Sequence, residues 1–468
     1  MTLSWPSGGS TKPYGIEVID FRRQIDAAWQ DLPGPGPLRW ASFFFTLFAL
    51  ALLLSVAAAQ VFFSCAGLCY AIDLIRRPRA PKFPPIKLPL ALFCILTVLS
   101  IGWAENPAVG WTAVRKLTLF LIILFAVNLL TSQRHLVFIY RLMFVESALA
   151  GLVAAAQFVL QYRQMRAEHP GQFYYYMTLM RIHGFMGHWM TFGGQQMLIF
   201  IALAAYVMGA PRNPDELALS PPAPAMAQHA PKFRRATLFW WVILAIVFAS
   251  LVLNFTRGVW LGCAIALLYL VARWRTRLLW ALPVGAVAIY LAAPSLLRER
   301  LQTLIHPSTD PAITVRFEMW HVGLAMIRRH PLVGVGPNNI NEVYLAYLPR
   351  GIVPVAAWHE HLHDVYLQLA AERGLPCFAA WLWLMGLLGW HSYRIRQKLA
   401  QDNAAGAIWI ADGCFAGWLA FVAEGFFEFN FGTTPVLMVF LLLVSVPFKL
   451  ADLEVTSHGS AQRTDSRF

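Results

Sequence analysis

The run WASFFFTLFALALLLSVAAAQVFFSCAGLCYAIDLI, at residues 40–75, decides the fold class of this chain. It is nearly twice as long as the roughly 20 apolar residues that a helix needs to cross a bilayer. We therefore expect two membrane-spanning helices here, with a tight break near residues 55–60. A basic cluster follows at once, and such clusters mark the cytoplasmic side of a membrane protein. It consists of Arg76, Arg77, Arg79 and Lys82.

The composition of the whole chain agrees with this interpretation. Of 468 residues, 58% are hydrophobic and only 13% are charged, which is too apolar for one soluble core. The formal net charge of +13 sits mostly in short Lys and Arg clusters between apolar runs. This is the positive-inside pattern, whose partner is anionic lipid headgroups. The chain is therefore predicted to be an all-α polytopic membrane protein and not a nucleic-acid-binding protein.

The alternation of apolar runs and basic clusters predicts about twelve membrane-spanning helices, with both termini in the cytoplasm. We expect no cleavable signal peptide, because residues 1–35 are polar. The expected spans lie at about 40–54, 60–75, 87–103, 109–130, 135–160, 189–209, 237–254, 258–272, 278–293, 377–393, 405–423 and 433–449.

The same alternation divides the chain into five regions. They are a cytoplasmic N-terminal segment (1–37), transmembrane helices 1 to 9 (38–294, with a Pro-rich cytoplasmic linker at 211–235), a large periplasmic catalytic loop (295–375), transmembrane helices 10 to 12 (376–450) and a cytoplasmic tail (451–468).

The large loop concentrates titratable residues between apolar blocks. It contains RFEMWHVGLAMIRRHPLVGVGPNN at residues 316–339 and HEHLHDVYLQLAAERG at residues 359–374. Charged groups beside a membrane are costly unless they meet water or a charged ligand. We therefore expect the active site in this loop. Short helices are predicted at 317–329 and 365–373, the second ended by Gly374 and Pro376.

The order of the spans places Arg257, Arg316 and His363 on the same, outer side of the membrane. Arg257 lies in NFTRGVWLG, a short hairpin between two spans, where it is either a snorkelling interfacial arginine or a functional one. A guanidinium group is always charged and matches phosphate oxygens in a bidentate fork. Two such groups at one cavity would suit a lipid-linked pyrophosphate.

Residues 359–363 also match HExxH, which on a helix presents two histidines to zinc with the glutamate as general base. Pro354 leaves little room for the long helix of such a site, and no third ligand has a clear signature. The other interpretation makes His363 a neutral general base, because the ordinary pKa of imidazole, about 6.5, lies near working pH.

Three segments together resemble the O-antigen ligase family and its relatives among O-antigen and exopolysaccharide polymerases. They are the 359–374 segment with its His363 and Gly374, the 316–339 segment, and NFTRGVWLG; RIHGFMGHWMTFGG, from Arg181, is also similar. The resemblance covers about residues 180–400. Asp364 departs from the Asn, Ser or Gln that usually follows this histidine in the family.

The resemblance implies a metal-independent, inverting glycosyltransferase of GT-C-like architecture without a cofactor. The donor would be a glycan on undecaprenyl pyrophosphate, and the acceptor a sugar hydroxyl, above all on lipid A-core in lipopolysaccharide biosynthesis. Arg257 and Arg316 would bind the pyrophosphate, with Arg181 and His188 beside the donor, and His363 would accept the proton of the acceptor. The resemblance places the enzyme in the bacterial inner membrane, with its site facing the periplasm.

Three alternatives remain open at the level of sequence. A polymerase would use the same donor and a different, lipid-linked acceptor. A small-solute transporter resembling bicarbonate transporters would show charged groups near mid-membrane, whereas this chain gathers its charge in an outer loop. A membrane zinc protease would depend on HExxH alone.

Overall fold

The computed structural model describes residues 26, 29–211, 233–305, 311–349, 351, 360–402 and 404–465. The described residues form helices and connections, with no strand among them. The predicted all-α fold is therefore confirmed. Most of the Pro-rich linker at 211–235 and most of the N-terminal segment lie outside the described residues.

Among the described residues, seven helices are long and apolar enough to cross a membrane, so the chain is a multi-pass membrane protein. They are α3 (Val56–Arg76), the joined α5 (Pro107–Leu117) and α6 (Leu121–Leu129), α7 (Gln133–Glu168), α9 (Trp189–Gly209), α11 (Arg257–Trp274), α17 (Ala405–Glu424) and α18 (Thr434–Asp465).

Shorter apolar helices occupy four of the remaining expected spans: α2 (Pro37–Ala51), α4 (Lys87–Ser100), α10 (Phe233–Leu253) and α12 (Leu282–Ala292). The last expected span, 377–393, lies in the second part of α16 (Val365–Gln401).

The first helix break lies slightly earlier than predicted. α2 ends at Ala51 and α3 begins at Val56, because Ser55 caps α3 with its hydroxyl, which accepts a hydrogen bond from the backbone N–H of Ala58 at 3.3 Å. Serine at this position satisfies one of the free N–H groups of the first turn.

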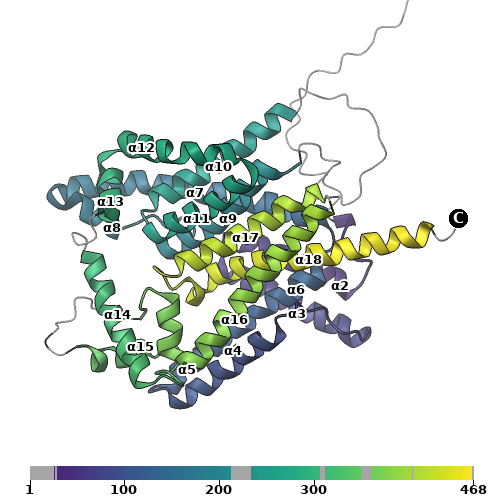
Figure 1. Cartoon of the computed structure of the whole chain (residues 1–468), viewed down its shortest axis with the longest axis horizontal. Coiled ribbons are helices and arrows are strands. Elements are labelled where there is room, and N and C mark those ends of the chain that lie inside the picture. Colours follow the sequence, from purple (N-terminus) through teal and green to yellow (C-terminus); the bar gives the residue numbers. More distant parts are fainter. Residues whose placement is uncertain are drawn as a thin grey trace, which may run out of the picture.

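The long helices run side by side, with α9 and α18 most deeply enclosed (Figure 1). The helices α8 (Phe173–Leu179), α13 (Ser295–Ile305), α14 (Pro311–Arg329) and α15 (Ile340–Val343) gather at one end of the bundle, which we call the loop end; the chain ends at the other (Figure 1). At 36 residues, α7 is about 54 Å long. Because a bilayer core is about 30 Å thick, α7 must project beyond it.

The loop end is joined to the bundle at Gly374, where α16 changes direction. As predicted, the short helix ends here: Gly374 has non-helical backbone angles (φ +78°, ψ 167°), and a second helical segment of α16 follows and runs to Gln401. A Cβ at Gly374 would lie 2.3 Å from the carbonyl oxygen of Leu332, so only glycine fits. Leu375 N–H donates to Pro331 O at 2.7 Å. Segment 331–336 thus packs directly on α16, where Val335 N–H and Gly336 N–H also donate to Ala371 O and Glu372 O.

Candidate active site

Asn254, in the turn between α10 and α11, joins two of the predicted segments. Its buried side-chain amide donates to the carbonyl oxygens of Ile182 and Trp189, both at 3.1 Å. The loop that begins at Arg181 is therefore held against the hairpin that begins α11 at Arg257. This contact explains why two motifs more than seventy residues apart come together at one place.

His363 is presented by a short segment that leads into α16. Its backbone has a positive φ of 51°, which is uncommon for a residue with a Cβ. The segment is fixed on both sides of His363: Leu362 N–H donates to the side chain of Gln368 at 2.7 Å, and Val365 N–H donates to Gly425 O at 2.7 Å. The second bond ties His363 to the turn at residues 425–433, which follows α17.

The neighbour of His363, Asp364, has a clear structural role. Its carboxylate accepts a hydrogen bond from Leu367 N–H at 2.9 Å and so caps α16. Asparagine and serine, which usually follow the histidine in the family, are equally good N-caps. The aspartate therefore keeps the helix start that positions His363.

Glu428, in the 425–433 turn, connects the predicted base to a predicted pyrophosphate ligand. Arg316 Nη2 lies 2.8 Å from Glu428 Oε1, and His363 Nδ1 lies 3.0 Å from Glu428 Oε2. Glu428 has only 3% of its side chain exposed, against 21% for Arg316 and 22% for His363. Burial alone would raise the pKa of Glu428, but Arg316 and His363 outweigh it and hold the pKa below its ordinary value.

Two further contacts fix the position of this turn. Arg316 Nη1 donates to Phe427 O at 2.5 Å, so its guanidinium group grips both a carbonyl and a carboxylate. Lys116 of α5 donates to Gly432 O at 2.8 Å. A Cβ at Gly258 would lie 3.0 Å from the Cβ of Phe427. The start of α11, next to Arg257, thus packs directly against the turn.

Arg181 and His188 lie on either side of Trp189. The guanidinium carbon of Arg181 lies 3.9 Å from the ring centroid of Trp189, and its Nε donates to Thr178 O at 2.6 Å. Burial lowers the pKa of Arg181, and the charges of Arg300, Arg316 and Arg257 lower it further. Arg181 therefore lies close enough to Arg300, Arg316 and Arg257 for their charges to act on it.

His188 is exposed and has a structural role as well. Its Nδ1 accepts a hydrogen bond from Met190 N–H at 3.2 Å and caps α9. Burial lowers its pKa, Glu428 raises it, and Arg181 and His363 lower it again. His188 is therefore a neighbour of the Glu428 unit, and the structure brings together all five residues expected from the sequence: Arg181, His188, Arg257, Arg316 and His363.

Two residues of this cluster were missed at the level of sequence. Glu428 stands in FFEFNFGTT, interpreted only as a polar turn, and its contacts with His363 and Arg316 span 65 and 112 residues. Arg300, on α13, is 4% exposed, and its Nε donates to Phe255 O at 3.2 Å, two residues before Arg257. A lone carboxylate among aromatic residues was the one available signal for Glu428.

The HExxH match is not on a helix where it is described. Residues 360–364 form a bend before α16, and His359 lies outside the described residues. His361 packs against Phe429, with ring centroids 5.3 Å apart. Burial, with His363 and Lys116, lowers the pKa of His361 to about 4. Within the described part of the chain, no three His, Cys, Asp or Glu side chains converge as metal ligands.

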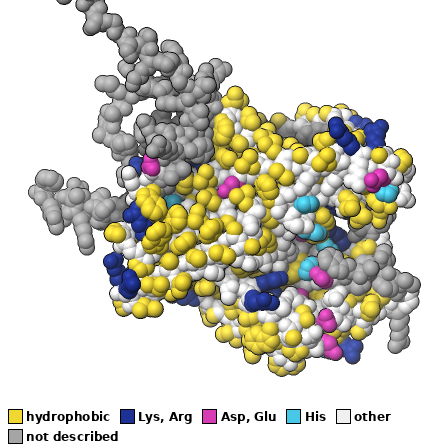
Figure 2. Space-filling model, turned by 180° about the vertical axis from the view of Figure 1, so that it is seen from behind, with side chains coloured by type: hydrophobic (Ala, Val, Ile, Leu, Met, Phe, Trp, Pro, Cys, Tyr) yellow, Lys and Arg dark blue, Asp and Glu magenta, His cyan; other side chains and the backbone are white. Residues whose placement is uncertain are grey.

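Charged and histidine side chains of the loop end are visible at the surface of the molecule (Figure 2). Histidine, arginine and acidic side chains gather around a hollow at the loop end, at the right of Figure 2. The surrounding surface of the bundle is largely hydrophobic (Figure 2). The arrangement can bind an anion beside a histidine whose Nδ1 is held by a carboxylate, which leaves Nε2 to accept a proton.

Residues 242–382 match the family model described as O-Antigen ligase. The match runs from α10 into α16 and includes Arg257, Arg300, Arg316 and His363. No curated protein matches the chain.

Proposed function

We propose, from the match of residues 242–382 to the O-antigen ligase family model, that the chain transfers a glycan from undecaprenyl pyrophosphate to a sugar hydroxyl. The acceptor is lipid A-core, and the product is O-antigen-bearing lipopolysaccharide. The observation that carries the proposal is the unit of Arg316, Glu428 and His363, in which a cation and a candidate base share one buried carboxylate.

His363 is the general base of this reaction. Glu428 binds Nδ1 of His363 and favours the form with its proton on that atom. Nε2 then accepts the proton of the acceptor hydroxyl while the hydroxyl oxygen forms a bond with the anomeric carbon. The bond between that carbon and the pyrophosphate oxygen breaks in the same step. A single displacement of this kind inverts the anomeric configuration.

Arginine side chains stabilise the leaving group. As the glycosidic bond breaks, negative charge develops on the pyrophosphate, and Arg257 and Arg316 neutralise it with Arg181 beside them. Together these arginines supply the positive charge that a divalent cation supplies in other glycosyltransferases. We therefore propose a metal-independent enzyme of GT-C-like architecture.

The proposed location is the inner membrane, with the loop at 295–375 in the periplasm and the linker at 211–235 in the cytoplasm. The basic clusters next to the apolar helices support this orientation. Reporter fusions in the linker and in the loop test it. Finding both on one side of the membrane would contradict the proposal, since Arg257 and His363 would then face opposite sides.

Deletion of the protein in its native host, followed by gel analysis of the surface glycan, tests the function. The expected result is loss of all polymer from the lipid core while polymer stays on the lipid carrier, restored by the wild-type chain but not by His363→Ala. If single repeats still reach the core, the protein is a polymerase, which uses the same donor. An unchanged glycan would overturn both.

A further inference from the structure

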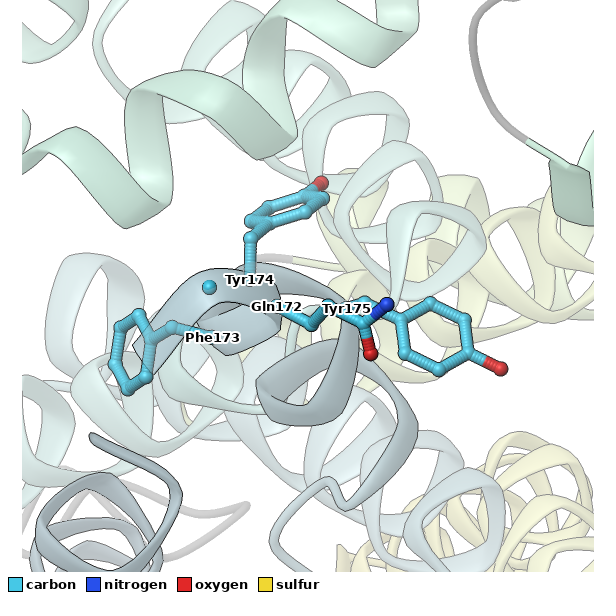
Figure 3. A pocket seen from close by; sticks show the side chains of 5 residues that line it. Gln172, Phe173, Tyr174 and Tyr175 are labelled. Carbon is cyan, nitrogen blue, oxygen red and sulfur yellow. The ribbon is translucent and has the colours of Figure 1, made fainter. Parts of the chain in front are cut away.

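A hollow lined by aromatic side chains lies beside α8 and is not part of the arginine cluster. It has a volume of about 440 Å³ and is lined by Gly171, Gln172, Phe173, Tyr174 and Tyr175 (Figure 3). Sites for small molecules in proteins have volumes of about 300–1,000 Å³. The lining offers aromatic rings, phenol hydroxyls and one amide, without a formal charge.

The aromatic side chains of this segment divide into anchored and open ones. Phe173 packs edge-on against Tyr162 of α7, with ring centroids 5.0 Å apart, and Tyr176 stacks on His169, with ring centroids 3.8 Å apart. Tyr175, by contrast, is 56% exposed. Figure 3 shows Tyr175 and Gln172 on the same side of the helix start, turned away from Tyr174. The segment is therefore a fixed platform with an open ring and an open amide.

Tyr174 is a third anchored residue. Its ring packs in a cluster with Phe255 and Leu296, on the side away from Tyr175 and Gln172 (Figure 3). The exposed ring of Tyr175 and the exposed amide of Gln172 are therefore the groups that a ligand in the hollow can reach.

The hollow is joined directly to the arginine cluster. Arg181 donates to Thr178 O, in the last turn of α8, and follows that helix by two residues. At seven residues, α8 is about 10 Å long. The hollow at its first turn therefore lies about 10 Å from Arg181, roughly the length of two sugar units.

We propose that this hollow is a binding subsite for the sugar units of the donor glycan beyond the one attached to pyrophosphate. A pyranose ring has a face of C–H groups that packs on an aromatic ring, and its hydroxyls bond to amides and phenols. Tyrosine suits such contacts because it offers a rigid ring with a polar tip. This inference rests on the proposed glycosyl transfer, since it concerns the donor of that reaction.

The test compares two donors with the same lipid pyrophosphate, one with a single sugar and one with several repeats, in transfer by purified protein. For Tyr175→Ala, KM of the long donor should rise about five- to tenfold, while KM of the single-sugar donor stays within about twofold. Tyr175→Phe, which keeps the ring, should restore most of the affinity. Equal effects on both donors would overturn the subsite.

A matched control separates glycan binding from contact with the membrane interface, where aromatic residues are common. Trp111 of α5 is 55% exposed, and α5 begins at the loop end, where Asn106 N–H is bonded to Asn339. Trp111→Ala should leave the KM of both donors unchanged. If it raises the KM of the long donor as much as Tyr175→Ala does, the aromatic residues contact lipid and the subsite is refuted.

A direct measurement of oligosaccharide binding tests the subsite independently of catalysis. The probe is free oligosaccharide, released by mild acid from the surface glycan of the host, and the readout is saturation-transfer NMR on the full chain. Wild type should bind and Tyr175→Ala should bind at least fivefold more weakly; equal binding by both would overturn the subsite. If the wild-type protein transfers neither donor, the proposed function is refuted instead. The binding measurement does not depend on transfer, so the two failures can be told apart.

Discussion

Charged side chains are paired differently at the two ends of the helical bundle. At the end opposite the loop end, Arg396 of α16 pairs with Asp412 of α17 at 2.8 Å, and Tyr269 donates to the same carboxylate at 2.7 Å. The pair is almost fully buried. One cation meets one carboxylate here, as expected of a contact that holds helices together.

At the loop end, one buried carboxylate is shared by two groups, and further arginines lie nearby. Glu428 serves both Arg316 and His363, while Arg181, Arg257 and Arg300 crowd nearby. Like charges held close together disfavour one another's charged forms, and a bound anion relieves this repulsion. The comparison teaches that a one-to-one buried pair joins helices, whereas several cationic side chains gathered at one place suit the binding of an anion. Five substitutions can break or sharpen this distinction.

The largest effect is expected at His363. His363→Ala removes the proton acceptor, so turnover should fall on the order of 10²–10⁴, the usual contribution of general acid–base catalysis, while donor binding survives. The measurement is in vitro transfer from a lipid pyrophosphate donor at controlled protein level. His321→Ala is the matched control, because His321 is an exposed histidine of α14. Near-normal transfer by His363→Ala would remove the general-base role.

Asp412→Ala should produce the largest loss of stability. It leaves the buried guanidinium group of Arg396 without its carboxylate, and breaking a buried pair in this way costs about 3–5 kcal/mol of the free energy of unfolding. Unfolding in detergent measures it, with the exposed Asp402→Ala as control. An equal, small change in both variants would show that the pair is not structural.

Arg316→Lys and Arg396→Lys make the same chemical change at the two ends. Lysine keeps the charge but loses the fork that lets Arg316 reach Phe427 O and Glu428 at once. Transfer by Arg316→Lys should fall at least about tenfold in kcat/KM, whereas Arg396→Lys should stay within about twofold. Similar losses of activity in the two variants would contradict the proposed difference between a ligand-binding arginine and a structural one.

The smallest effect concerns the pH dependence of Glu428→Gln. The pKa of Glu428 is lower in the folded protein than the ordinary value, so its stabilising contribution is present above pH of about 4.3 and is lost as pH falls through the folded pKa. The variant should be less stable than wild type by about 1 kcal/mol at pH 7. The gap should shrink below pH of about 4; a gap that widens on acidification would contradict the ion pair.

The fold was predictable because the thickness of the bilayer sets the length of apolar sequence that a spanning helix needs. A run of apolar residues long enough to cross must form a helix, and each of the twelve expected spans coincides with one. Local signals also predicted the end of the short helix at Gly374, where the backbone is non-helical. They did not indicate that the backbone of Leu332, more than forty residues away in the chain, packs on this kink.

The candidate site was predictable only in part. His363, Arg257 and Arg316 stand in segments with a recognisable pattern, whereas the partner that joins two of them, Glu428, lies in another loop. Its contact with His363 depends on the bond from Val365 N–H to Gly425 O, a tertiary contact that no local pattern indicates. Arg300 was missed for the same reason, since only packing brings α13 beside Phe255.

Binding of undecaprenyl pyrophosphate and undecaprenyl monophosphate to the purified protein tests the central claim most directly, because the two lipids differ only in the charged group that the arginines would hold. The account predicts tighter binding of the pyrophosphate, with that preference lost in Arg316→Lys and kept in His363→Ala and Arg396→Lys. Equal binding of the two lipids by wild type, or a preference that Arg316→Lys leaves unchanged, would contradict it.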